Sequence, residues 1–329
     1  MKYLRNRCTN AHYNMAFDQF CLEELEADEP VFCLWRNAPA VIIGLNQNAY
    51  AEVNMPFLRE RGIVLARRVT GGGAVYHDLQ NLNYTIVGRS ADLERDYPGY
   101  LTYVIEALRS LGVPATLSGR NDIMVEGRKV SGYAKRVWKD RLMVHGTLMY
   151  DVDLDTLTRA LSVDGSKLEA HGIASVRSRV ANLRDYLPQL PTVEALQTAL
   201  EGILSRGYAD SEVVLTPAQQ ERISEIARTR FATWEWNIGR SPLATFTRRA
   251  RFSCGTVEAH IAVEKGVITR LSFGGDFLGN SPADVLAARL VGCRYDRDAL
   301  AARLDTIAVA DYFDRLTTDE LILLVKGFI

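Results

Sequence analysis

The chain has 329 residues, a length typical of about two domains. Hydrophobic residues make up 47% and charged residues 24%, as in ordinary globular proteins, and the formal net charge of −1 favours neither nucleic acid nor an acidic membrane as a partner. The five cysteines are scattered without a C-x-x-C pair, which excludes a disulfide framework or a zinc site as the basis of the fold. No apolar run approaches the ~18 residues of a membrane span, and the first seven residues lack the apolar core of a signal peptide. We therefore expect a cytoplasmic protein.

The first elements are predicted from hydrophobic spacing and from helix caps. Asn10 is a suitable cap for a helix that runs to about residue 25. The apolar runs 31–35 and 40–44 are separated by Arg-Asn-Ala-Pro, which predicts a hairpin. A polar loop, residues 46–48, follows.

A glycine-rich loop then connects two predicted strands. Residues 63–66 form an apolar run, residues 67–78 read Arg-Arg-Val-Thr-Gly-Gly-Gly-Ala-Val-Tyr-His-Asp, and residues 74–76 favour extended structure again. Three glycines permit positive φ and expose backbone N–H groups, while arginine binds phosphate with two parallel hydrogen bonds. The loop therefore predicts a phosphate or adenylate cradle, although it lacks the order of a P-loop. A glycine-rich hairpin with solvated arginines is the alternative.

A second informative stretch follows a strand at 84–87 and a helix at 97–111. Residues 123–125 and 129–131 favour two strands joined by a turn, and residues 120–141 contain seven basic and three acidic side chains. This basic patch is either a solvated hairpin face or a surface for a polyphosphate or an acidic partner. Lys129 is of particular interest, because a lysine inside a strand is disfavoured unless it lies at an edge or meets an anion. His145, in a strand at 142–150, is by itself most simply a hydrogen-bonded core or edge histidine.

The remaining pattern predicts helices at 153–161, 192–206 and 217–230, with a small basic loop at 172–180 after the first. Beyond a tryptophan-rich joint, residues 234–242, a hairpin at 256–263 and 267–273 precedes three short helices. Locally paired strands and few helices favour a mixed sheet over regular βαβ winding. We expect two domains, residues 1–245 and residues 246–329, the second a small α+β unit.

Seven stretches together resemble lipoate–protein ligase A of the two-domain bacterial type, a member of the biotin/lipoate ligase superfamily, and the resemblance extends nearly end to end. The stretches are residues 32–37, 67–78, 119–122, 128–132, 145–148, 175–183 and 234–242. The resemblance implies an α+β fold with a mixed β-sheet flanked by helices, biotin/lipoate ligase-like and class II synthetase-like, and a C-terminal accessory domain.

The resemblance also implies a reaction in two steps. ATP and lipoate would give lipoyl-AMP and pyrophosphate, and the lipoyl group would pass to a lysine of an apo lipoyl domain in a 2-oxoacid dehydrogenase complex or in the glycine cleavage H protein. ATP and Mg²⁺ would be required, and we expect a monomer whose accessory domain moves between the steps.

The same resemblance assigns roles to residues of the two stretches. The ATP and lipoyl-AMP contacts would come from Arg68, Thr70, Gly73, Ala74, Val75, Tyr76, Asn121 and Lys129. Lys129 would be the catalytic residue, and lipoate would be bound by Lys129, His77 and His145. Asp122 would contact Mg²⁺.

The sequence departs from the family pattern in a short link between Val125 and Arg128 and in Tyr133, which follows Ser131-Gly132. Three other functions are considered. A biotin ligase is compatible with the expected fold, but its glycine–arginine loop has a different order from this one. An octanoyltransferase of the same superfamily would use a thiol, but no cysteine lies between Cys33 and Cys254. A non-catalytic lipoate binder would not need a lysine beside a phosphate cradle.

Overall fold

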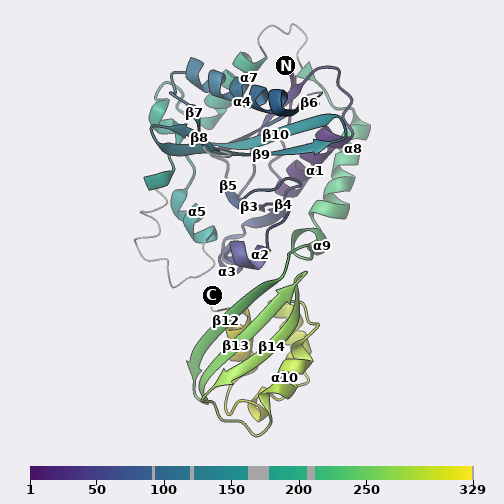
Figure 1. Ribbon diagram of the computed structural model, residues 1–329, viewed down its shortest axis with the longest axis vertical. Coiled ribbons are helices and arrows are strands. Elements are labelled where there is room, and N and C mark those ends of the chain that lie inside the picture. Colours follow the sequence, from purple (N-terminus) through teal and green to yellow (C-terminus); the bar gives the residue numbers. More distant parts are fainter. Residues whose placement is uncertain (91–92, 119–121, 162–177, 206–211, 328–329) are drawn as a thin grey trace. The chain divides into compact units, whose positions relative to one another are not determined.

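The computed structural model describes residues 1–90, 93–118, 122–161, 178–205 and 212–327. The chain divides into two compact units (Figure 1). The first unit comprises Met1–Leu45 and Glu52–Thr233, and the second comprises Asn46–Ala51 and Trp234–Ile329. The division therefore falls between Thr233 and Trp234, whereas the boundary expected after residue 245 lies inside a strand, β12 (Ala244–Phe252).

Two sheets organise the first unit, and the large one is the mixed sheet expected from the sequence. Its strand order is β11-β1-β2-β6-β10-β9-β8-β7, with β1 parallel to both of its neighbours and the other pairs antiparallel. The bounds are β1 (Lys2–Leu4), β2 (Val31–Trp35), β6 (Asn81–Arg89), β7 (Thr116–Ser118), β8 (Asp122–Val125), β9 (Arg128–Trp138), β10 (Arg141–Met149) and β11 (Glu212–Val213). The small sheet has the order β4-β3-β5, with β3 (Ala40–Ile43), β4 (Val64–Arg67) and β5 (Val75–His77).

Helices cover both faces of the large sheet (Figure 1). On one face lie α4 (Leu93–Ser110) and α7 (Val193–Leu204), and on the other lie α1 (Ala11–Glu23) and the small sheet. Asn10 caps α1 as expected, because its side chain accepts a hydrogen bond from the Tyr13 N–H. The remaining elements of this unit are α3 (Met55–Arg61), α5 (Leu154–Ala160), η2 (Leu183–Tyr186), α8 (Pro217–Ile226) and η3 (Ala227–Phe231).

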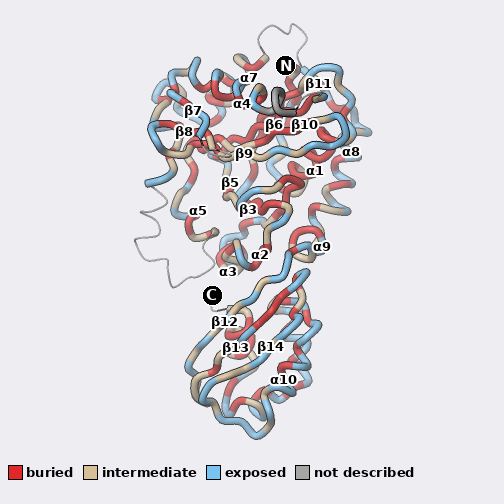
Figure 2. Tube along the Cα trace, viewed as in Figure 1, coloured by how far each residue is buried: buried red, intermediate tan, exposed pale blue. Residues whose placement is uncertain are grey.

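Alternation along β6 and β10 gives the large sheet one apolar and one polar face. Leu82, Tyr84 and Ile86 enter the hydrophobic core under α4 and α7, and so do Leu142 and Val144. Because successive strand residues point to opposite faces, the residues between them face α1 and the small sheet. β6 is buried up to its last residue, and most of β10 is buried (Figure 2), so Asn83, Thr85 and His145 of the second face are enclosed.

The expected hairpin between residues 31–35 and 40–44 is wrong. Residues Val31–Trp35 pair with β1 and β6, whereas Ala40–Ile43 pair with β4 and β5 in the other sheet. Both runs are fully buried, so neither has the alternating pattern that identifies the sheet to which a strand belongs.

The second unit is an antiparallel sheet of β12, β13 (Gly255–Glu264) and β14 (Val267–Gly275), with helices packed on it. The unit contains the helices α9 (Trp234–Asn237), α10 (Ala283–Leu290), α11 (Arg297–Leu304) and α12 (Thr318–Lys326), with a short turn η4 (Val309–Asp311). Of these, α10 packs on β14, and α12 packs on β12 and β13. The expected hairpin of β13 and β14 is confirmed, and β12 was not expected. Within the described residues, no helix combines the length and apolar character needed to span a bilayer.

A short insertion from the first unit's sequence also belongs to the second unit. We call this segment, Asn46–Ala51, the strap; it leads into the short helix α2 (Ala49–Glu52). The Ala49 N–H donates to the Ser241 hydroxyl at 3.2 Å, and the Lys326 ammonium lies 4.0 Å from the Tyr50 ring centre and 4.3 Å from the Tyr295 ring centre. Tyr50 is buried against Tyr295, so the strap is part of this unit's core.

Candidate functional site

A cavity of about 190 Å³ lies in the first unit between the polar face of the large sheet and the glycine-rich loop. Its described walls combine apolar side chains with a few polar groups. They are Met15, Trp35, Ile42, Arg68, Gly72, Gly73, Ala74, Val75, His77, Asn83, Lys129, Gly132, Tyr133, Ala134, His145, Gly146 and Thr147. Such a mixture is typical of a small-molecule site.

The glycine-rich loop is held against the turn that follows β3. The Leu45 N–H donates to the Thr70 carbonyl at 2.8 Å, and a Cβ placed on Gly44 would lie 2.1 Å from the Gly72 carbonyl oxygen. Gly72 itself has φ 92°, a conformation that other residues rarely adopt. These two glycines are therefore required for the close approach of the two turns.

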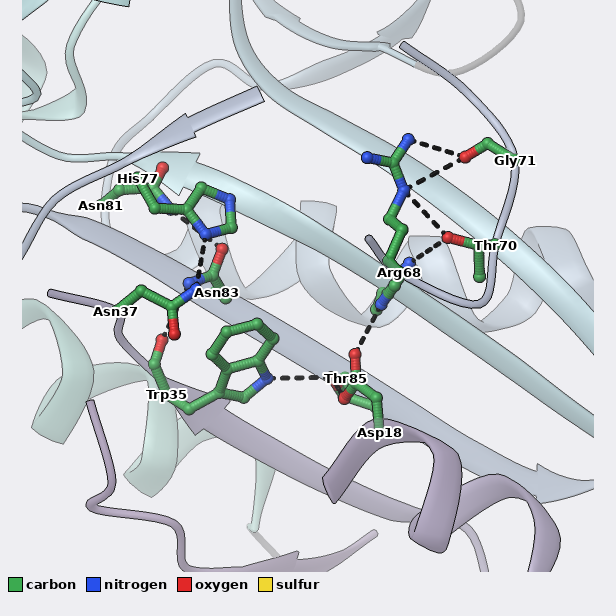
Figure 3. Close-up of polar contacts among 11 residues, drawn as sticks. Asp18, Trp35, Asn37, Arg68, Thr70, Gly71, His77, Asn81, Asn83 and Thr85 are labelled. Carbon is green, nitrogen blue, oxygen red and sulfur yellow. Dashed lines mark hydrogen bonds and ion pairs between the residues drawn. The ribbon is translucent and has the colours of Figure 1, made fainter. Parts of the chain in front are cut away.

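Arg68 organises this loop from within (Figure 3). Its Nε donates to the Thr70 hydroxyl at 3.0 Å, and its Nη2 donates to the carbonyls of Gly71 at 2.7 Å and Gly73 at 2.8 Å. Its Nη1 donates to the Ile42 carbonyl at 3.1 Å. Burial lowers the pKa of Arg68 to about 10, so the guanidinium remains charged at neutral pH. The Arg68 guanidinium therefore binds the backbone of the glycine-rich loop and places a positive charge next to it.

Lys129 provides an amine to the same cavity. Its Nζ forms an ion pair with Asp122 Oδ1 at 2.7 Å, and both side chains are one third exposed. A Cβ on Gly132 would lie 2.9 Å from this Nζ, so the glycine leaves space for the lysine side chain. The Lys129 carbonyl accepts from the Ala181 N–H at 2.9 Å, which ties its strand to the following segment.

A buried polar chain runs behind the cavity from α1 to the glycine-rich loop (Figure 3). Asp18 Oδ1 accepts from the Thr85 hydroxyl and its Oδ2 faces His145 Nδ1, both at 2.7 Å; His145 Nε2 lies 2.7 Å from the Thr70 hydroxyl. Because a carboxylate accepts only, His145 Nδ1 donates to Asp18, and in a neutral ring Nε2 would accept from Thr70. Asp18 was missed by sequence reasoning, because a buried carboxylate within a helix has the same local sequence as a solvated one.

His77 belongs to a second buried chain. Its Nδ1 lies 3.0 Å from Asn37 Nδ2, and its ring packs edge-on against Trp35 with 6.2 Å between centres. Burial, with the charge of Arg68 as a smaller cause, lowers the pKa of His77 to about 3, so the ring is neutral at physiological pH. From the sequence, Asn37 was placed in a turn and in one of the resembling stretches, without a role at the site.

The structure brings together most of the residues singled out from the sequence. Those in the cavity wall are Arg68, Gly73, Ala74, Val75, His77, Lys129 and His145. Thr70 is fully buried behind the wall, Asp122 lies beside Lys129, and Tyr76 alternates to the other face of β5. Asn121 and most of the basic loop at 172–180 lie outside the described residues.

Two other observations concern metals and thiols. Within the ranges that the structure describes, no group of three or more His, Cys, Asp or Glu side chains is arranged to hold a metal ion. None of the described wall residues is a cysteine, and burial raises the pKa of the Cys33 thiol, so this thiol is a poor nucleophile.

Comparison with known proteins agrees with this geometry. Residues 10–204 match the family model of the lipoyl protein ligase A/B catalytic domain, and residues 241–325 match that of the bacterial lipoate protein ligase C-terminus. The chain is 37% identical over 330 residues to lipoate-protein ligase LplJ of Bacillus subtilis, covering 99% of this chain and 100% of that protein.

Comparison with solved structures also finds lipoate–protein ligases. A bipartite lipoate protein ligase of Thermoplasma acidophilum, studied with its E2 lipoyl domain, is 30% identical with a TM-score of 0.66, over 72% of this chain and 96% of that one. A lipoate-protein ligase A bound with ATP is 30% identical with a TM-score of 0.64, over 72% of this chain and 98% of that one. The fold and the site thus define an α+β ligase with a catalytic and a C-terminal part. The chain belongs to the lipoate–protein ligase family and is a ligase.

Proposed function

We propose that this ligase activates lipoate with ATP to form lipoyl-AMP and pyrophosphate, and then transfers the lipoyl group to a lysine of an apo lipoyl domain. The observation that carries the proposal is that the Lys129 amine and the glycine-rich loop line one cavity whose other walls are largely apolar. An ATP-bound relative and a relative studied with a lipoyl domain support it.

The first step brings a carboxylate to the α-phosphate of ATP. The carboxylate oxygen forms a bond to phosphorus as the bond to pyrophosphate breaks, and negative charge gathers on the phosphate oxygens. We assign to Lys129 the stabilisation of this charge, and to the loop from Gly73 to Tyr76, with Thr70 and Asn121, the binding of the nucleotide. Arg68 supports this loop through its carbonyl contacts and adds positive charge behind it.

A magnesium ion fits the donor set only in part. Asp122 offers one partly exposed carboxylate beside Lys129, and Mg²⁺ is commonly held by one or two carboxylates together with substrate phosphates and water. Asp122 would hold such an ion once nucleotide is bound, and the ion would neutralise phosphate charge.

In the second step the amine of the carrier lysine attacks the acyl carbonyl of lipoyl-AMP. An amide bond forms, AMP leaves with the electron pair of the broken bond, and the amine loses a proton. Apo domains of 2-oxoacid dehydrogenase complexes and the H protein are the proposed carriers. We assign the chemistry to the first unit and an accessory role to the second.

Mass spectrometry of an apo lipoyl domain incubated with the protein, lipoate and ATP tests the proposal. We expect one lipoyl group on the carrier, dependent on ATP and absent when the carrier's target lysine is replaced by arginine. Modification from an acyl-carrier thioester without ATP would favour the octanoyltransferase. Lipoate binding without any product would favour a non-catalytic binder.

A further inference from the structure

The orientation of the Asn14 side chain follows from neighbours that can only accept hydrogen bonds. Asn14 Nδ2 lies 2.9 Å from the Cys8 carbonyl oxygen and 3.1 Å from the Arg36 carbonyl oxygen. The amide nitrogen must face these two acceptors. The same nitrogen lies 2.7 Å from Asn37 Oδ1, while Asn14 Oδ1 accepts from Asn6 Nδ2 at 2.9 Å. The orientation of one buried amide therefore fixes that of the next.

The orientation of the Asn37 amide determines which ring nitrogen of His77 carries the proton. Asn37 is fully buried, and since its oxygen accepts from Asn14, its nitrogen faces His77 Nδ1 at 3.0 Å. An amide nitrogen only donates, so His77 Nδ1 must accept. The neutral ring consequently carries its proton on Nε2, a tautomer set by a residue that does not line the cavity.

The Nε2–H of His77 is a buried donor at the cavity. His77 is only 3% exposed, it lines the cavity, and its Nε2 has no hydrogen-bond partner among the described residues. Buried donors in native proteins nearly always have an acceptor, so a bound ligand is the natural partner. His145 differs, because Asp18 and Thr70 occupy both of its ring nitrogens. Of these two cavity histidines, only His77 offers a polar hydrogen to a ligand.

Strand register places His77 far from the amine of Lys129. Trp35 pairs with Asn83, Asn83 pairs with Thr147, and the Thr147 hydroxyl accepts from the Gly132 N–H at 3.2 Å. Trp35 and Gly132 are thus three strand spacings apart, ~14 Å at ~4.8 Å per spacing.

The His77 ring and the Lys129 amine lie at opposite ends of this series of paired strands. The His77 ring packs on Trp35, and the Lys129 Nζ lies at Gly132. A ligand whose carboxylate meets Lys129 therefore meets His77 near its opposite end.

We infer that Asn37 is a positioning residue for substrate selection: by holding His77 as the Nε2–H tautomer, it directs a donor at the distal sulfur atoms of a lipoyl chain. The inference rests on lipoate being the substrate, as proposed above. Divalent sulfur is a weak acceptor, whereas the methyl end of octanoate accepts nothing. The donor therefore favours the sulfur-bearing acid over octanoate, by about 3- to 10-fold in Kd.

The test reverses the tautomer without changing the shape of the side chain. In Asn37→Asp the carboxylate only accepts, so the His77 proton moves to Nδ1 and Nε2 presents a lone pair to the cavity. Nitrogen-15 NMR of histidine-labelled protein, with the His77 signals assigned by their loss in His77→Phe, should show Nε2–H in the wild type and Nδ1–H in the variant. Calorimetric Kd values should show the preference for lipoate over octanoate falling by about 3- to 10-fold.

Asn10→Asp is the matched control. It makes the same substitution at the cap of α1, where the side-chain oxygen accepts from the Tyr13 N–H at 3.0 Å and aspartate caps equally well. This variant should retain both the His77 tautomer and the preference for lipoate.

A second pair of variants serves if Asn37→Asp does not fold. His77→Gln places an amide nitrogen near the Nε2 position and should retain the preference, and His77→Phe should lose it. An Nδ1–H signal in the wild type, or one unchanged Kd ratio in all variants, overturns this inference while the ligase assay still stands. A wild-type protein that binds neither acid overturns both this inference and the proposed function.

Discussion

Lys129 is one third exposed and ion-paired to Asp122, so its removal takes away a charge without opening the core. We expect Lys129→Ala to reduce lipoate-dependent pyrophosphate release by about 100-fold or more, because preorganised charge at a phosphoryl centre contributes strongly to the rate. Stability should change by no more than about 1 kcal/mol, as is usual for exposed ion pairs. A coupled pyrophosphate assay and a urea titration measure the two effects. Near-normal turnover would remove Lys129 from the mechanism.

His77 makes stability depend on pH. Its pKa is about 3 in the fold, whereas an unfolded histidine accepts a proton below about pH 6.5. Between these values the unfolded state binds more protons, so stability decreases as the pH falls from 6.5 towards 3. Between pH 7 and pH 5 the loss through this residue is about 2 kcal/mol. Urea unfolding at both pH values should show that His77→Phe removes this component. Equal losses in the two proteins would contradict the buried neutral histidine.

Single residues were predictable where their chemistry is unusual for their local pattern. Lys129 within a strand and three consecutive glycines are such cases, and Lys129, Gly72 and Gly73 line the cavity. Asp18 and Asn37 were not predictable, because a buried polar residue in a helix or a turn has the same local sequence as a solvated one. Their roles depend on partners 127 and 40 positions away, which only the fold brings together.

The turn after β3 and the glycine-rich loop act as one element, since Gly44 packs directly on Gly72. We expect Gly44→Ala to displace the loop, with a loss of about 1–3 kcal/mol in stability from overpacking. Adenylate formation should fall by about 10-fold or more, because small displacements of binding groups are costly in rate.

Gly71→Ala is the stability control for this substitution. A Cβ at Gly71 meets no atom within 4 Å, so its free energy of unfolding should stay within about 0.5 kcal/mol of the wild type. Equal melting curves for the Gly44 and Gly71 variants would show that the loop adapts to the added methyl group.

Elements with a single clear signal were predicted well. The cap at Asn10 and the turn at Glu264-Lys265-Gly266 fix α1 and the β13–β14 hairpin from local sequence alone. Pairing between buried strands was not predictable, because Val31–Trp35 and Ala40–Ile43 are apolar throughout. Sheet membership there depends on contacts far away in the sequence.

The strap concerns the whole molecule, because residues within the catalytic sequence complete the core of the second unit. We expect Tyr50→Ala to destabilise that unit by about 3 kcal/mol, the usual cost of removing a buried aromatic ring. Hydrogen exchange by mass spectrometry should show faster exchange in β12, β13 and β14 and unchanged exchange in β6 and β10.

Tyr103→Ala, at a tyrosine that is 49% exposed, is the matched control and should alter exchange little. Unchanged exchange in the second unit of Tyr50→Ala would show that the strap is dispensable to it. The strap has no sequence signal of its own.

The chain enters the second unit at Asn46, leaves it after Ala51 and returns at Trp234. The two units are therefore interleaved, and no single cut separates them into two complete pieces. A fragment starting at Trp234 would lack Tyr50, which packs on Tyr295. The complementary fragment would contain Tyr50 but lack Tyr295 and Lys326, which contact its ring. Separately produced halves should thus complement each other as a split protein, because the N-terminal half supplies the strap that the C-terminal half lacks.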